Sequence, residues 1–408
     1  MAKNLSIVAE GISGDEGKLL GYNVTDNGIY TPAIGDVARD TTATYVAQDG
    51  TIKTAQPNVA RVDYTNGVAE LLLEPESTNL IPYSEKFNSS KWLSQGGTIS
   101  DGGSLDGYNS VIKYVSDEGS NFQQIYSLGS QQAPIGAYSQ STMFKAVGFS
   151  YLWIKNDLLD SAFLCYDLIN KTIISQDSNY DSANIKFTEK PNGWIKLEIS
   201  FTSLKVTDLI LPQLYVSASS SSPFENVNSA TIYETMAQVE QLTYPTSYIP
   251  TNGAIATRGA DSMTNFGSEQ IIDSESGILF FEGSKSTDVG YLNLVGETTN
   301  DKVQYNLQSN GYLQYRISTG GVSVYSYQSS DYRMQVNENI KIAIKYKVGS
   351  TAQAYYNGIE INSDIFDSVA GSTPLKEFKF ASPNGSTAFY GRVRQVKHLP
   401  YNTDITTL

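Results

Sequence analysis

The chain has 408 residues, a formal net charge of −14 and a charged fraction of 17%. This length exceeds what one typical hydrophobic core accommodates, so we expect two or three domains. The acidic balance argues against nucleic acid, whose backbone needs a basic surface, and against electrostatic docking on anionic lipid. We therefore expect neither a nucleic-acid nor a membrane partner.

The composition favours a β-rich surface protein. Polarity comes from 28 Tyr, 33 Gly and abundant Ser, Thr and Asn rather than from charge, and these residues suit pleated faces and turns. Cys165 is the one cysteine, so the chain has no internal disulfide and no cysteine metal cluster. It lies in the apolar run 163–166, which predicts a buried structural thiol. The first residues lack the apolar stretch of a signal peptide, and no run of about 18 apolar residues predicts a membrane span.

Residues 1–40 are rich in Gly and Asp and show no helical period. Composition favours two interpretations equally: an extended arm or small β unit that docks on other subunits, or a poorly ordered tail. Residues 41–80 predict two hairpins and a further strand. Asp49-Gly50 and Asn66-Gly67 are turn dipeptides, each flanked by apolar residues. The run 71–73 should end at Glu74-Pro75, because proline cannot donate to a strand ladder.

Residues 81–257 carry short strand patterns separated by turn clusters. In the segment 194–201, polar and apolar side chains alternate with period two, and Trp194 begins the strand directly after the turn 191–193, as a core residue does. Strands at this spacing, with no helical period between them, predict an antiparallel sandwich.

The segment 252–261 is small, polar and contains glycine, which predicts a linker. A second strand-dense block follows in residues 266–408. Ile340, Ile342, Ile344 and Tyr346 share one face of an expected strand, while the intervening lysines face water. Asn357-Gly358 is the strongest two-residue hairpin signal in the chain.

These segments resemble a known class of proteins. The connector from Tyr45 to Trp92 resembles a segment of tailed-phage virion proteins, the head- and tail-fibre class, that precedes a carbohydrate-binding-module-like jelly roll. The motifs 191–194 and 246–251 look like that jelly roll. The motifs 355–358 and 389–399 resemble a concanavalin-A-like, laminin-G-like sandwich.

The resemblance implies an all-β chain with two antiparallel jelly-roll sandwiches after an extended N-terminal segment. It implies four parts, which are a virion-attachment and oligomerisation segment at 1–40, a hairpin connector at 41–80, a jelly roll at 81–257 and a laminin-G-like sandwich at 266–408.

We expect no enzyme. His398 is the single histidine, and its place in the last expected strand predicts a half-exposed strand residue rather than a catalytic base. Glycan hydrolysis needs two carboxylates about 5–9 Å apart, and the Glu-x-Asp-x-x-Glu strand motif of jelly-roll glycosidases does not occur. The acids Asp157, Asp160 and Glu198 are interpreted as solvated residues.

Glycan binding needs aromatic platforms for sugar CH faces together with planar polar side chains. The candidate ligand-binding residues are Trp92, Tyr126, Trp153, Tyr355 and Tyr356. Asp288, Asp301 and Asn357 are oxygen-bearing residues of the kind that bind Ca²⁺, but no spacing supports a calcium site. We therefore assign no cofactor and make no prediction about a bound metal.

We therefore expect a structural and binding component of a tailed-phage virion, in the head or the tail, that recognises host-surface glycans. The chain would form a homotrimer, contact other virion proteins through its N-terminus and reach the virion surface after synthesis in the host cytoplasm. The alternatives are a polysaccharide depolymerase of the same particle and a bacterial surface adhesin.

Overall fold

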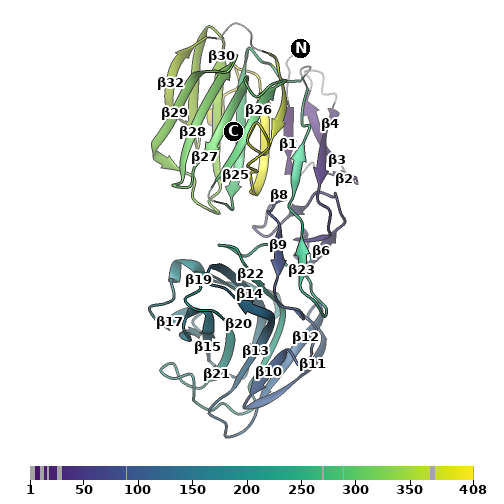
Figure 1. Cartoon of the computed structure of the whole chain (residues 1–408), viewed down its shortest axis with the longest axis vertical. Helices are drawn as coiled ribbons and strands as arrows, with labels where there is room; N and C mark the ends of the chain where they lie inside the picture. Colours follow the sequence, from purple (N-terminus) through teal and green to yellow (C-terminus); the bar gives the residue numbers. More distant parts are fainter. Residues whose placement is uncertain are drawn as a thin grey trace. The chain divides into compact units, whose positions relative to one another are not determined.

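The computed structural model describes residues 5–9, 13–15, 18–24, 30–88, 90–268, 271–287, 289–367 and 373–407. Within these residues the protein is all-β, with antiparallel sheets stacked into sandwiches (Figure 1), so the expected fold class is confirmed. The helical segments among the described residues are short 3-10 turns, such as Asp157–Leu159. None of the helices in this part of the chain is long and apolar enough to cross a membrane.

The chain divides into two compact units. Unit 1 comprises Met1–Glu76 and Gly259–Leu408, and unit 2 comprises Ser77–Arg258. Unit 2, blue and teal in Figure 1, is thus an insertion in the sequence of unit 1. The organisation expected from the sequence has four successive parts with boundaries at 40, 80 and 257. The structure instead groups the first 76 residues with the C-terminal sandwich.

Unit 2 is a sandwich of two antiparallel sheets. One sheet has the order β11-β12-β22-β14-β19-β18, and the other has the order β10-β13-β21-β15-β16-β17, with β20 also pairing β13. The strands of the first sheet are β11 (Gly97–Leu105), β12 (Tyr108–Ser116), β14 (Ala137–Val147), β18 (Ile185–Lys190), β19 (Trp194–Thr202) and β22 (Thr231–Glu240). Those of the second are β10 (Trp92–Gln95), β13 (Gln124–Ala133), β15 (Tyr151–Asn156), β16 (Ala162–Asp167), β17 (Thr172–Gln176), β20 (Thr207–Ile210) and β21 (Gln213–Ser217).

The core of unit 2 lies between these sheets and takes alternate residues from each strand. On β19, Ile195, Leu197 and Ile199 enter the core as the alternation predicts. Trp194 is also buried, but it packs with Met143 and Met236 in a smaller cluster apart from that core.

The ends of unit 2 are joined by a two-stranded ribbon. The strand β9 (Ser77–Asn79) pairs antiparallel with β23 (Ala256–Arg258). The predicted linker 252–261 contains the boundary between the two units, at Arg258 and Gly259, together with the strand β23. The side chain of Asp261, at the end of this segment, is buried in unit 1.

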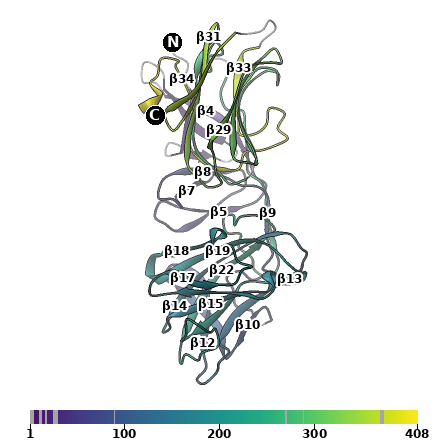
Figure 2. The same ribbon diagram turned by 90° about the vertical axis from the view of Figure 1, so that its left-hand side faces the viewer.

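Unit 1 is built on an eight-stranded and a five-stranded sheet, which Figure 2 shows edge-on as two layers. The larger has the order β32-β31-β30-β25-β34-β8-β7, with β1 also pairing β34, and the smaller has the order β29-β28-β27-β26-β33. The strands of the larger sheet are β1 (Leu5–Val8), β7 (Val62–Asp63), β8 (Glu70–Leu73), β25 (Ser276–Lys285), β30 (Ile340–Lys347), β31 (Ser350–Tyr356), β32 (Ile359–Phe366) and β34 (Gly391–Leu399). Those of the smaller are β26 (Gly290–Gly296), β27 (Lys302–Leu307), β28 (Tyr312–Thr319), β29 (Val322–Arg333) and β33 (Leu375–Lys379).

The N-terminal segment and the connector supply strands to unit 1. Leu5 pairs with His398 and Leu71 pairs with Val393, so β1 and β8 both lie beside the last strand, β34. A further sheet joins β2 (Ser13–Asp15), β3 (Lys18–Val24), β4 (Tyr30–Ala38) and β24 (Ser262–Thr264), and β5 (Ala43–Val46) forms a hairpin with β6 (Ile52–Ala55). Both predicted connector hairpins are thus present. Parts of the predicted attachment segment, at 1–4, 10–12, 16–17 and 25–29, lie outside the described residues.

Local turn chemistry in unit 1 follows the sequence. Asn357 and Gly358 have φ values of 48° and 81° and join β31 to β32 by the predicted two-residue turn.

The prediction that His398 is a half-exposed strand residue is wrong, because this residue is 0% exposed and its Nε2 lies 3.0 Å from the hydroxyl of Tyr346. A β-bulge at Arg394 shifts the alternation of β34, so that Val396 and His398 both face inward.

Candidate functional site

The outer face of the second sheet of unit 2 carries aromatic and amide side chains. On β15, Leu152 and Ile154 enter the core, so Tyr151, Trp153 and Lys155 point to the opposite face. The same alternation places Phe163 of β16 there, beside Trp153 and Tyr215. Residues that sequence analysis treats as separate strands therefore share one surface.

The strand register aligns these side chains in rows. Gln124 lies opposite Tyr215, which lies opposite Trp153, which lies opposite Cys165. Directly opposed residues on one face have Cβ atoms about 4.5–5.5 Å apart. One row thus holds an amide, two aromatic rings and a thiol whose pKa burial raises to about 12. Cys165 is buried, as the sequence predicts.

Phe163 is the centre of an aromatic cluster on this face. Its ring lies 5.6 Å from the ring of Tyr215, 6.0 Å from Phe224 and 6.4 Å from Trp153, each in an edge-to-face arrangement. Phe224 in turn lies 4.7 Å from Phe122. Phe122 and Phe224 are 47% and 37% exposed, which leaves apolar ring surface open to solvent.

The loop that follows β21 holds Phe224 over the sheet. The indole Nε1 of Trp153 donates to the carbonyl of Ser219 at 2.9 Å, and the hydroxyl of Ser217 donates to the carbonyl of Ser222 at 2.7 Å. These bonds fix the loop on the face and leave Trp153 8% exposed. Trp153 therefore supports the surface from beneath, while Phe224 and Phe163 form its outer part.

A short polar network borders the aromatic cluster. The hydroxyl of Tyr215 donates to Oε1 of Gln213 at 3.2 Å, and Nε2 of Gln213 donates to Oδ2 of Asp157 at 2.8 Å. Lys155 forms an ion pair of 2.8 Å with Asp157. Partial burial opposes ionisation of Asp157, but hydrogen bonds and the charge of Lys155 outweigh it and lower the pKa of Asp157. Burial, Asp157 and Tyr126 raise the pKa of Tyr215 to about 12.

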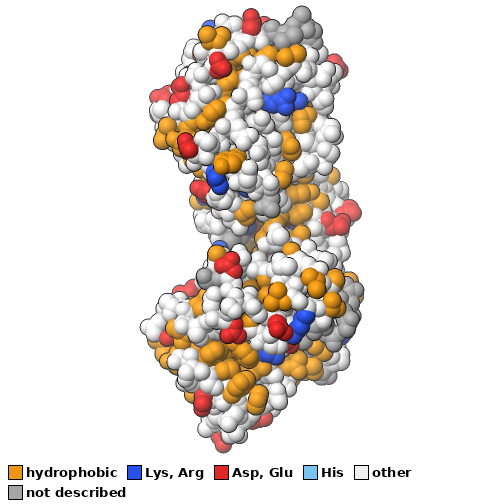
Figure 3. Space-filling view, turned by 60° about the vertical axis from the view of Figure 1, so that its left-hand side comes forward, with side chains coloured by type: hydrophobic (Ala, Val, Ile, Leu, Met, Phe, Trp, Pro, Cys, Tyr) orange, Lys and Arg blue, Asp and Glu red, His pale blue; other side chains and the backbone are white. Residues whose placement is uncertain are grey.

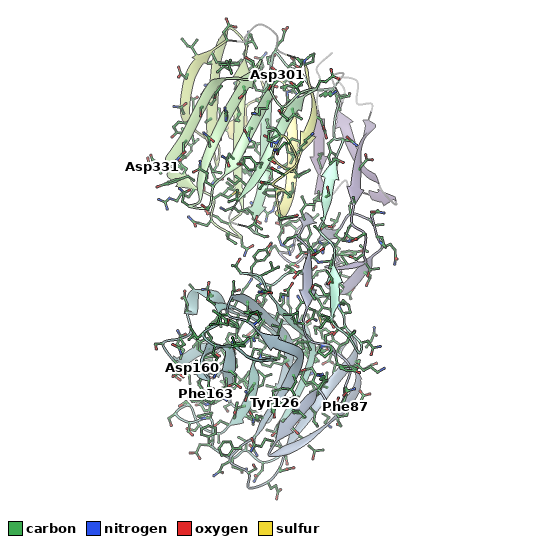
Figure 4. The ribbon with its side chains drawn as sticks, viewed as in Figure 1. Phe87, Tyr126, Asp160, Phe163, Asp301 and Asp331 are labelled. Atoms are coloured by element: carbon green, nitrogen blue, oxygen red, sulfur yellow. The ribbon has the colours of Figure 1, made fainter. Side chains whose placement is uncertain are left out.

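Two of the five predicted ligand-binding residues lie on this face. Tyr126 of β13 is half-buried and lies on the same sheet as Phe163, as Figure 4 labels them, and Trp153 lies beneath the aromatic cluster. Trp92 is 0% exposed in the sandwich core, with its Nε1 donating to the carbonyl of Tyr83 at 2.8 Å. Because no part of its ring reaches the surface, Trp92 is a core residue.

The other two predicted residues belong to unit 1 and point to opposite faces of β31. The hydroxyl of Tyr355 donates to Glu360 at 3.1 Å, and its side chain packs against a small apolar cluster that includes Phe280 and Ile405. Tyr356 packs against the core of unit 1 and donates to the carbonyl of Arg333 at 2.9 Å. The structure therefore does not bring these two tyrosines into one site.

Sequence reasoning missed Phe122, Phe163, Phe224, Gln124 and Gln213. The signal that finds Phe163 is the parity of the strands: once Leu152 and Leu164 are assigned to the core, the odd-numbered residues of β15 and β16 must face outward. Hydrophobic side chains form patches on the surface of unit 2 in the space-filling view (Figure 3).

The acidic residues considered for catalysis are each paired with lysine. Besides Asp157, Glu198 lies 2.8 Å from Lys196 and Asp160 lies 3.4 Å from Lys205. The carboxylate of Asp301 accepts hydrogen bonds from the backbone N–H groups of Gly320 and Thr373, and the Asn357 side chain accepts one from the N–H of Lys341.

Asp288 lies outside the described residues, so the expected oxygen-bearing set is described only in part. Within the described part of the chain, no group of three His, Cys, Asp or Glu side chains is arranged to hold a metal ion.

Comparisons with known proteins give distant structural likeness. No protein-family model matches the chain, and no curated protein matches it. Among solved structures, the CBM40 domain of a Ruminococcus gnavus IT-sialidase, bound to α2,3-sialyllactose, is 15% identical over 31% of this chain and 75% of its own, with a TM-score of 0.26. Domains LG4-5 of the mouse laminin α1 chain are 11% identical over 69% and 88%, with a TM-score of 0.25. A lichenase derived from a mouse hindgut metagenome is 12% identical over 37% and 76%, also with a TM-score of 0.25.

Proposed function

We propose that unit 2 binds glycans through the outer face of the sheet that contains β15, β16 and β21. The observation that carries this proposal is the aromatic cluster around Phe163, whose outer rings Phe122 and Phe224 are exposed. The amides of Gln124 and Gln213 border it. Aromatic faces pack against the CH groups of sugar rings, and planar amides hydrogen-bond to their hydroxyls. The carboxylate of Asp157 is paired with Lys155, so recognition rests on stacking and neutral hydrogen bonds.

The proposal extends to the setting in which the protein works. The sequence resemblance of the connector supports a structural protein of a tailed-phage virion, in the head or the tail, that reaches host-surface glycans from the particle surface. Each site would bind its sugar weakly, with a Kd between high micromolar and millimolar, and a homotrimer would raise the effective affinity by avidity. A mass spectrum of purified phage particles tests this part, since it must contain peptides of the chain.

Replacing Phe163 with serine should weaken glycan binding by about tenfold, because it removes the ring that joins Trp153, Tyr215 and Phe224. The measurement is an array of host-derived glycans with the intact oligomer, followed by titration of the best ligand. Binding of the unaltered protein should change little between low and moderate salt, because few ion pairs are screened.

The matched control for this variant is Ile169→Ser. Ile169 is 71% exposed in the turn after β16, so the change removes a similar apolar side chain from the same unit but away from the face. A cooperative thermal unfolding transition in each variant would establish that both variants fold. Equal loss in both variants, or silence of the folded protein across the array, would leave unit 2 as a spacer domain.

A further inference from the structure

The smaller sheet of unit 1 has a polar outer face that the proposed function of unit 2 does not use. Leu292, Leu294, Val303 and Tyr305 enter the core, so the intervening residues of β26 and β27 point away from it. The strand register then aligns one row across all five strands. This row consists of Lys379, Asn293, Gln304, Arg316 and Ser326.

Arg316 has no carboxylate partner among the described residues. Its Nε donates to the hydroxyl of Ser323 at 3.2 Å. Lys302, in the neighbouring row, donates to the carbonyl of Thr299 at 3.0 Å and forms no ion pair with an acid in the described part of the chain. Lys302 lies opposite Ser318 and Arg316 lies opposite Gln304, so the two cations are diagonal neighbours on the sheet. Burial and the charge of Arg316 lower the pKa of Lys302, while the charge of Asp301 opposes this shift.

This pair of cations is unusual in a chain with a net charge of −14. Among the described residues of the strands, one carboxylate on this face is Glu377, which lies 3.2 Å from Lys379 and accepts the N–H of Asn265 at 2.9 Å. Glu377 is therefore paired with Lys379 on the edge strand β33, away from Arg316 on β28. No carboxylate of the described residues forms an ion pair with Arg316, whereas the charge of Asp301 acts on Lys302.

Amides lie directly beside the cations. Gln304, next to Arg316 in the row, is 5% exposed. Asn293 is fully buried; its Nδ2 donates to the carbonyl of Ala381, while its Oδ1 has no hydrogen-bond partner among the described residues. A buried acceptor without a donor costs about 1–3 kcal/mol. Because both amides are buried, they support the row from beneath and do not face a ligand.

We propose that this row is a binding site for an acidic polysaccharide whose sugars carry carboxylates. Arg316, supported by Lys302, would pair with the carboxylate in the two-pronged geometry that guanidinium favours. Ser326, the exposed residue beside Arg316 in the row, would hydrogen-bond to the sugar hydroxyls. Two cations are too few for a nucleic-acid duplex, whose specific binding neutralises many phosphates.

The test uses the full chain with Phe163→Ser as background, so that the proposed site on unit 2 binds about tenfold more weakly and contributes little. Polygalacturonate and alginate are titrated against it, each beside its methyl-esterified form, which keeps the sugar backbone but removes the charge. We expect binding of at least one acidic polymer, at least tenfold weaker binding of its ester, and affinity that falls as salt rises.

The variant Arg316→Gln should weaken binding by about tenfold, because it removes one charge-assisted contact. The control Lys347→Gln changes the net charge equally at an exposed residue of β30 and should leave binding unchanged. No binding of either acidic polymer, equal binding of acid and ester, an unchanged affinity in Arg316→Gln, or equally tight binding of dextran sulfate would each overturn the proposal. The Phe163 background keeps this outcome separate from that of unit 2.

Discussion

Replacing Asp261 with alanine should destabilise unit 1 by about 3–5 kcal/mol, because it leaves buried charge without its partner. Asp261 forms an ion pair of 2.8 Å with Arg39 through one carboxylate oxygen, and the other oxygen contacts Arg61. Both arginine side chains are 0% exposed. Burial alone would lower the pKa of Arg61, but the charges of Glu74 and Asp261 outweigh it and raise that pKa.

This cluster joins segments that are far apart in the sequence. Arg61 also pairs with Glu74 at 2.7 Å, and the N–H of Asp261 donates to the carbonyl of Glu74 at 2.9 Å. The start of the second half of unit 1 is therefore held against the end of its first half. Loss of Asp261 removes the group that pairs with both arginines.

The measurement separates the two units by their tryptophans. All three tryptophans, Trp92, Trp153 and Trp194, belong to unit 2, so their fluorescence reports only its unfolding. Asp261→Ala should lower the unit 1 transition in calorimetry and leave the tryptophan transition unchanged. The control Glu297→Ala removes an exposed ion pair of 3.5 Å with Lys376 and should cost less than about 1 kcal/mol. Similar melting of both variants would show that the buried cluster contributes little.

The second large effect concerns Glu234, a carboxyl group in the core of unit 2. Glu234 is 0% exposed; one oxygen accepts a hydrogen bond from Thr142 at 2.8 Å, and the other has no partner among the described residues. Burial raises the pKa of Glu234 to about 8, although the bond from Thr142 opposes this. The folded protein therefore holds a proton here at pH values where the unfolded chain has released it.

The sign of the pH effect follows from this difference. The stabilising contribution is complete below about pH 4.5, the ordinary pKa of a glutamic acid, and is lost as the pH rises to about 8. The loss amounts to a few kcal/mol, since one pKa unit corresponds to about 1.4 kcal/mol. Glu234→Gln keeps the shape and removes the titration, so its tryptophan-detected stability should fall less between pH 5 and 9.

The stability of the unaltered chain must be compared with that of Glu234→Gln, because other acids of unit 2 also have shifted pKa values. Burial also raises the pKa of Glu240, while Lys196 lowers the pKa of Glu198 against the effect of burial, and both groups remain in the variant. Denaturant titrations of the two proteins at matched pH cancel these contributions. Parallel stability curves for the wild-type chain and Glu234→Gln would show that Glu234 ionises normally in the folded state.

Local signals in the sequence predicted much of the fold. Asn357-Gly358 forms a hairpin because both residues accept positive φ, and the segment after Trp194 forms a half-buried strand because its side chains alternate. The place of the N-terminal strand could not be predicted in this way. Leu5 pairs with His398 across nearly the whole chain, and no short-range pattern encodes such a partner.

The candidate site on unit 2 was predicted only in part, for a related reason. Trp92 and Trp153 are the same residue type in similar apolar strands, yet Trp92 points into the core and Trp153 points to the outer face. The direction of each depends on which neighbouring residues pack between the sheets. Phe163 and Phe224 have the composition of core residues, and only the register of β16 and the loop after β21 bring them together on the surface.

The glycan-binding face of unit 2 is tested most directly through the three tryptophan indole groups. Their Nε1 atoms donate to different acceptors: Trp92 to the carbonyl of Tyr83, Trp153 to the carbonyl of Ser219 and Trp194 to the carboxylate of Asp106. In protein labelled with ¹⁵N-tryptophan, the three indole N–H signals are therefore separate probes of the core, the proposed face and the outer side of the opposite sheet. On addition of a glycan that binds in the array, the Trp153 signal should shift in proportion to saturation, and the other two should stay in place. A shift of Trp194 instead, or saturation with Trp153 unmoved, would contradict the proposed face.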